Sequence, residues 1–171
     1  MTTSLDIAAW LVSQHGTETR LTNLSLNKLC FYAQVESLRS TGTTLFDDPI
    51  EAWQYGPVCP NVYHAYKRYG RASIPAPATE TPDLSDSEAV VMDMLWKDYG
   101  WLSAYDLVRL SHRDGGAWSK AWMQGRDTSI TPDLILNSTD IDGFDPDRTF
   151  AASVKRVEHR YRNTLRLLEN S

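Results

Sequence analysis

One segment of the sequence, Ser111-His112-Arg113-Asp114 followed by two glycines, has the residue types that nucleophilic or acid–base catalysis requires. The pKa of an unperturbed imidazole is about 6.5, so His112 is suited to act as a general base near neutral pH. A charged histidine near the end of a helix also interacts favourably with the last carbonyl groups, by about 0.3–1 kcal/mol. We favour this structural role for His112 and keep catalysis as an alternative.

Other motifs that carry chemistry are absent from the sequence. Its four histidines lie outside the H-E-x-x-H pattern of zinc enzymes, and the sequence has neither a glycine-rich phosphate loop nor a nucleophile elbow. Cys30 and Cys59 do not form a C-x-x-C pair, and we expect them to be reduced, partly buried thiols. The sequence therefore predicts no metal site, no cofactor and no enzymatic activity.

Aromatic side chains are unusually dense between residues 31 and 69. We expect Phe31 and Trp53 to lie in the core. Tyrosines at positions 63, 66 and 69 cannot share one face of a helix, because each three-residue step drifts by about 60°. Tyrosine, tryptophan and arginine are the residues that dominate protein–protein hot spots. A first candidate contact patch therefore comprises Tyr55, Tyr63, Tyr66, Lys67 and Arg68.

Capping and breaking residues predict a mainly α-helical domain. One helix begins at Thr22 or Asn23 and ends before Gly42, and Pro60 is suited to be the first residue of another. Two further helices begin at capping boxes, formed by Ser85 with Glu88 and by Ser103 with Asp106. A short β element is expected near residues 45–55, as half of a hairpin that Gly56-Pro57 would end.

The two ends of the chain differ in character. Residues 1–125 are predicted to form one globular domain, and residues 126–171 an acidic loop followed by an appended amphipathic helix. That helix would begin at Asp145-Pro146 and pack on the domain or on a partner. Its basic residues Arg156, Arg160 and Arg162 form a second candidate contact patch.

Composition limits the function classes. The chain has 171 residues and a net charge of -5, which argues against a general nucleic-acid binder because phosphate neutralisation needs clustered Lys and Arg. The first residues lack a secretion signal, and no apolar run approaches the roughly 18 residues of a membrane span. We therefore expect a cytoplasmic protein that does not contact membranes.

An ordered set of short motifs carries a family resemblance. The first three segments contain Lys28, Leu29, Phe31, Tyr32, Ala33 and Gln34, then Glu51, Ala52, Trp53, Tyr55, Gly56, Pro57 and Val58, then Val62, Tyr63 and Tyr66. Farther on, Leu110-Ser111-His112 and Trp118 continue the series, although Ala117 stands where proline is usual. Over roughly residues 5–125 the chain resembles the Panacea domain, or SocA-like, family, which occurs beside toxin genes in bacteria and phages.

The resemblance implies an antitoxin that is not an enzyme and that neutralises a cognate toxin, encoded by an adjacent gene, by direct binding in a hetero-oligomer. Toxins linked to the family include small alarmone-synthetase-like enzymes that inhibit translation. Structural positions of the family motifs correspond to Lys28, Phe31, Tyr32, Trp53, Gly56, Pro57, His112 and Trp118.

Three alternatives stay open at this point. The chain would be a proteolytic adaptor that delivers its toxin to a protease, a prophage-associated regulator that binds nucleic acid through the terminal helix, or an enzyme centred on His112. A regulator's binding would fall steeply with salt.

Overall fold

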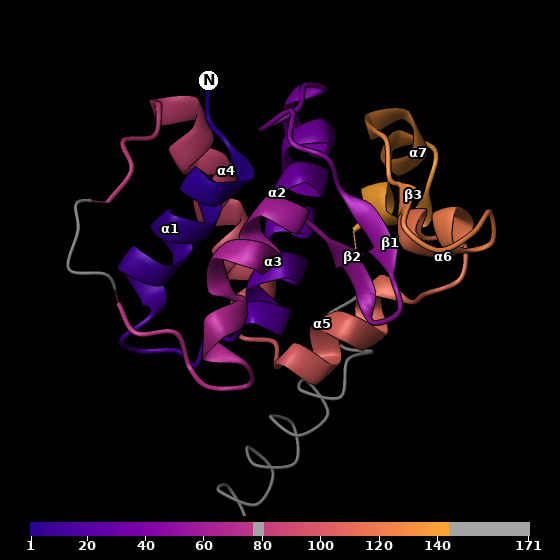
Figure 1. Cartoon of the computed structure of the whole chain (residues 1–171). Helices are drawn as coiled ribbons and strands as arrows, with labels where there is room; N and C mark the ends of the chain where they lie inside the picture. Colours follow the sequence, from indigo (N-terminus) through magenta and orange to yellow (C-terminus); the bar gives the residue numbers. More distant parts are fainter. Residues whose placement is uncertain (77–80, 144–171) are drawn as a thin grey trace, which may run out of the picture.

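The computed structural model describes residues 1–76 and 81–143, and this part of the chain is mainly α-helical (Figure 1). Its α-helices are α1 (Ser4–His15), α2 (Asn23–Thr41), α3 (Pro60–Tyr66), α4 (Asp86–Tyr99), α5 (Ala104–Ser111), α6 (Ala117–Trp122) and α7 (Pro132–Leu136). Two short 3-10 helices, η1 (Lys67–Tyr69) and η2 (Thr139–Asp142), follow α3 and α7. The predicted C-terminal helix, with Arg156, Arg160 and Arg162, lies outside the described residues.

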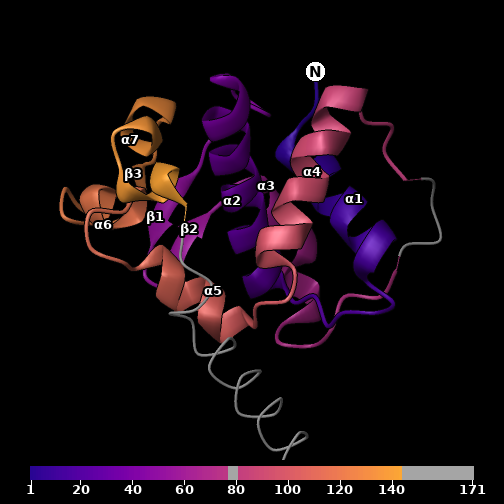
Figure 2. The same ribbon diagram turned by 180° about the vertical axis from the view of Figure 1, so that it is seen from behind.

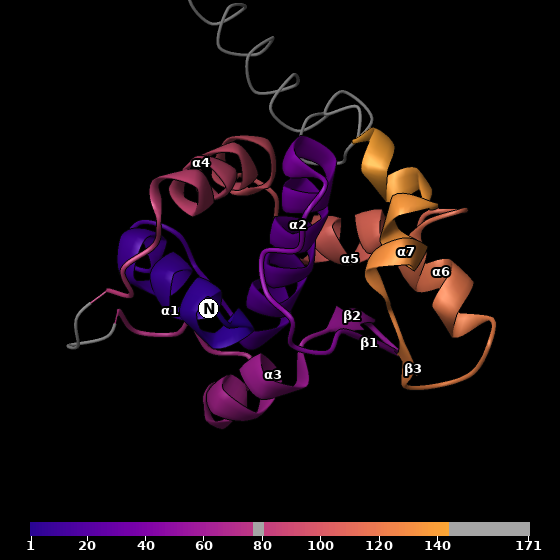
Figure 3. The same cartoon turned by 90° about the horizontal axis from the view of Figure 1, so that it is seen from above.

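Helix α2 is the centre of the fold. It packs against α1, α3, α4, α5 and α7, and α3 and α4 cover opposite faces of it (Figures 1 and 2). Seen from above, α2 lies between the α1–α4 pair and the small sheet (Figure 3). Thr22 is the N-cap of the helix, and its side chain accepts a hydrogen bond from the Ser25 amide. Gly42 is the C-cap, in the left-handed region (φ 73°). Both ends were predicted.

The core around α2 contains aromatic and polar side chains as well as aliphatic ones. Phe31 is completely buried, as predicted, and the Tyr32 ring stacks on Tyr99 with centroids 4.5 Å apart. Trp53 is only half-buried, so its prediction as a core residue is wrong. Its indole N–H donates to the Glu51 carboxylate at 2.8 Å, and this partner keeps one edge of the ring at the surface.

The β element is a hairpin with an additional edge strand. Strands β1 (Glu51–Trp53) and β2 (Gly56–Val58) are antiparallel, and Ala52 is opposite Pro57. Strand β3 (Thr128–Ser129) pairs with the other edge of β1, which gives the order β2-β1-β3. Gly56-Pro57 therefore begins the second strand rather than ending the extended segment.

The described part of the predicted acidic loop has regular structure. Residues 126–143 contain β3, α7 and η2, and α7 and η2 both contact α2. The loop prediction is wrong for these residues. Helix α7 begins at Pro132 with Thr131 as its N-cap, and Ser138 caps η2.

Candidate functional site

The tip of the β-hairpin presents the most exposed aromatic side chain of the described residues. Gln54 and Tyr55 form the turn between β1 and β2, and the Tyr55 side chain is 64% exposed. Burial of a ring of this size in an interface is favourable, because it removes a large apolar surface from water. Tyr55 is therefore the first candidate for a contact residue.

Buried side chains hold the backbone of the hairpin by hydrogen bonds. The Trp118 indole N–H donates to the Trp53 carbonyl at 2.8 Å, and the Lys28 amine donates to the Pro57 carbonyl at 3.1 Å. Asn27 accepts a hydrogen bond from the Cys59 amide at 3.0 Å, immediately after β2. These bonds fix the turn that carries Tyr55, so a partner would meet a preformed contact.

Lys28 is fully buried under the hairpin. Burial lowers the pKa of its amine to about 7, because the charged form is separated from water. Of the carboxylates in the described residues, none forms an ion pair with it. The Lys28 side chain can lie this close to the hairpin because residue 56 is a glycine. A Cβ at this position would lie 2.6 Å from the Lys28 Cε, and its φ of +108° also favours glycine.

The free energy of unfolding should depend on pH through Lys28. The unfolded chain keeps this amine protonated up to about pH 10.5, whereas the folded protein releases the proton near pH 7. Because the unfolded state binds more protons above pH 7, stability should rise with pH, by about 1 kcal/mol between pH 7 and pH 8. Urea unfolding of the wild type and of Lys28→Met at both pH values measures this contribution. An equal rise in the variant would contradict the assignment to Lys28.

His112 does not form a catalytic pair with Ser111. Its Nδ1 lies 2.7 Å from the Val108 carbonyl, which accepts only, so this nitrogen carries the proton. The Ser111 hydroxyl, 3.2 Å from the same nitrogen, itself donates to Val108 at 2.8 Å. His112 lies at the C-cap of α5 and contacts the ring of Trp118, whose indole N–H holds the hairpin at the Trp53 carbonyl. This arrangement supports a structural role in positioning the hairpin turn.

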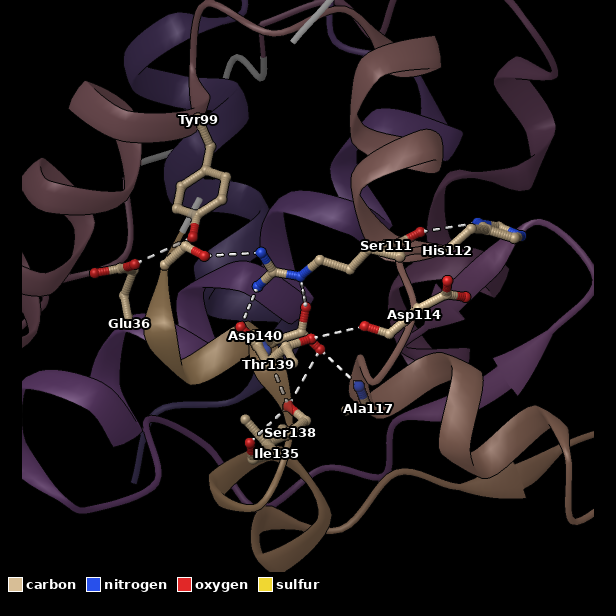
Figure 4. Close-up of polar contacts among 12 residues, drawn as sticks. Glu36, Tyr99, Ser111, His112, Asp114, Ala117, Ile135, Ser138, Thr139 and Asp140 are labelled. Atoms are coloured by element: carbon tan, nitrogen blue, oxygen red, sulfur yellow. Dashed lines mark hydrogen bonds and ion pairs between the residues drawn. The ribbon is translucent and has the colours of Figure 1, made fainter. Parts of the chain in front are cut away.

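A buried carboxylate joins residues 138–143 to the loop between α5 and α6 (Figure 4). Asp140 is completely buried, and its Oδ1 accepts from Arg113 Nε at 3.1 Å while its Oδ2 accepts from the Ala117 amide at 2.7 Å. The other guanidinium nitrogens donate to the Thr139 and Gly143 carbonyls, each at 2.7 Å. Each of the three guanidinium nitrogens therefore has an acceptor, and the ion pair with the buried Asp140 is supported by two further hydrogen bonds.

Two hollows flank the hairpin tip. The larger, which we call the α2–α5 groove, has a volume of about 1040 Å³ and lies between the start of α2 and the start of α5. The smaller, which we call the Tyr63 pocket, has a volume of about 370 Å³ and is lined by Asn27, Lys28 and Trp53 as well as Tyr63. Tyr55, Leu24 and Gly70 line both. The exposed tyrosine thus stands between two concave surfaces.

The structure brings together only part of the first predicted patch. Tyr63 is half-buried in α3 and lies near Tyr55 around the smaller pocket. Tyr66 is half-buried and packs against the core, whereas Lys67 and Arg68 are exposed on η1 and line neither hollow. The Arg68 guanidinium lies 4.8 Å from the centroid of the Tyr69 ring.

Sequence reasoning missed several residues of the groove. Leu24 is exposed in the first turn of α2, and Tyr105 is exposed in the first turn of α5. Both are large apolar residues that lie just after a helix cap and outside the buried face of their helix. This pattern could have identified them from the sequence. Arg20 and Arg71 line the same groove from two loops, where the sequence holds no such pattern.

Other kinds of site find no support in the described residues. Within them, no cluster of three or more His, Cys, Asp or Glu side chains is arranged to hold a metal ion. Both cysteines are buried. Among the helices of residues 1–76 and 81–143, none has the length and apolar character needed to cross a bilayer.

Comparison with known proteins adds an independent finding. Residues 26–119 match the family model described as antitoxin SocA-like, Panacea domain. Antitoxin SocA of Caulobacter vibrioides (strain NA1000 / CB15N) is 31% identical over an alignment of 109 residues, and the match covers 57% of this chain and 58% of that protein. The chain thus matches less than two thirds of this relative's length. No solved structure matches the chain.

Proposed function

The chain belongs to the SocA-like antitoxin family with a Panacea domain, and from this membership we propose that it neutralises a cognate toxin by binding it directly. The observation that carries the proposal of direct binding is the exposed ring of Tyr55 on a hairpin fixed by buried side chains. Interface anchors are typically aromatic residues next to well-formed hollows, and Tyr55 lies between two. The partner would be a toxin encoded by an adjacent gene, and both proteins would act in the cytoplasm.

Co-expression tests this function. The chain is produced together with the product of the adjacent gene, and growth, toxin level and co-purification are scored in the same culture. We expect the chain to restore growth and to co-purify with an undiminished amount of toxin. Restored growth with disappearance of the toxin would instead indicate a proteolytic adaptor. A harmless neighbour that does not co-purify would contradict the proposal.

A further inference from the structure

We propose that the α2–α5 groove receives an amphipathic segment of the toxin that carries acidic side chains beside apolar ones. This inference rests on the proposed antitoxin function and specifies which surface of the toxin the chain recognises. It is carried by the exposed apolar side chains that gather in the groove and by the charges around them.

Three exposed apolar side chains from separate elements line this groove. Leu24 of α2 is 41% exposed, Tyr55 of the hairpin 64% and Tyr105 of α5 62%. Exposed apolar side chains are ordinary when they are scattered, whereas a cluster in a concave surface indicates a binding site. The other large exposed hydrophobic residues of the described part, such as Val90 and Met123, line neither hollow.

The charges at the groove are mainly positive, although the protein as a whole is acidic with a net charge of -5. Arg20 and Arg71 are exposed and line it, and Arg109 lies with its guanidinium carbon 5.8 Å from the centroid of the Tyr105 ring. Glu18 is the one carboxylate among the lining residues. Complementary charge steers association and suppresses wrong partners, so this rim selects a segment with carboxylates.

The groove is large enough to hold a segment of a partner rather than a single side chain. Its volume of about 1040 Å³ slightly exceeds the ~300–1,000 Å³ typical of small-ligand pockets. Binding of an amphipathic helix in an apolar groove uses anchors that are spaced along one face. Leu24, Tyr55 and Tyr105 would contact the apolar face of the segment, and Arg20 and Arg71 its acidic edge.

Charge reversal tests the acidic edge. In the complex with the toxin, we expect Arg20→Glu/Arg71→Glu to raise Kd at least tenfold and to reduce the dependence of association on salt. The matched control is Lys97→Glu/Arg126→Glu, which makes the same change in net charge at exposed positions outside the groove. We expect this control to change Kd less than threefold. Equal losses in both double variants would overturn the proposal.

Site-specific photo-crosslinking provides a second measurement. A photoreactive phenylalanine analogue replaces Tyr105 or, as a control outside the groove, Val90, and mass spectrometry identifies the linked toxin peptide. We expect position 105 alone to crosslink, to a peptide with several Asp or Glu residues. A bound toxin that does not crosslink there, or that does so through a peptide without carboxylates, refutes this inference and leaves direct neutralisation standing. Absence of any complex with the wild type refutes both.

Discussion

Replacing Asp140 by alanine should lower the free energy of unfolding by about 3–5 kcal/mol, because it leaves the Arg113 guanidinium without its charged partner. The substitution also removes the acceptor of the Ala117 amide, which is buried. Asp140 is completely buried, so water does not replace these bonds without structural rearrangement. Urea unfolding followed by circular dichroism measures the change.

A surface aspartate of the same segment is the matched control for this substitution. Asp133 is exposed in the first turn of α7. Asp133→Ala should change the free energy of unfolding by no more than about 0.5–1 kcal/mol. This is the effect expected when an exposed acidic residue near a helix N-terminus is replaced. A loss below about 1 kcal/mol for Asp140→Ala would show that residues 138–143 contribute little to the cooperative unit.

Replacing Tyr55 by alanine should weaken toxin binding by at least about 2 kcal/mol, which is roughly a 30-fold increase in Kd. The ring is exposed in the free protein and stands between the α2–α5 groove and the Tyr63 pocket, so the partner would bury it from both sides. The thermal stability of the free protein should stay nearly constant, since Tyr55 contributes little buried surface. Calorimetric titration and growth rescue both measure the loss.

Val90→Ala is the control for Tyr55→Ala. Val90 is also an exposed apolar residue, at 57%, but it lies on α4 outside both hollows. Its truncation should leave both Kd and growth rescue unchanged. If Tyr55→Ala bound as tightly as the wild type, the hairpin tip would not be an interface anchor.

Features that depend on neighbouring residues in sequence could be predicted. The capping boxes at Ser85 and Ser103 form as expected, because each is closed by a side chain three residues away. The hairpin segment was also expected, from alternating aromatics between turn residues. The division of the chain near residue 125 and the role of the candidate contact residues stay predictions.

Features that depend on distant residues were missed. Residues 126–143 have short elements with weak local patterns, and their position depends on Asp140 contacting Arg113 and Ala117, which are 27 and 23 residues away. The groove was missed for the same reason. Its lining residues Leu24, Tyr55 and Tyr105 come from three elements that only the tertiary fold brings together.

The complete burial of Cys30 and Cys59 makes the native chain convenient for site-specific labelling. Burial raises the pKa of both thiols, that of Cys59 to about 12, so almost no reactive thiolate is present at neutral pH. Maleimide dyes should therefore leave the folded wild type unmodified. A cysteine introduced at an exposed position, such as Arg126→Cys, would take a single fluorophore without removal of the native thiols. The protein can thus report partner association by fluorescence with both native cysteines retained.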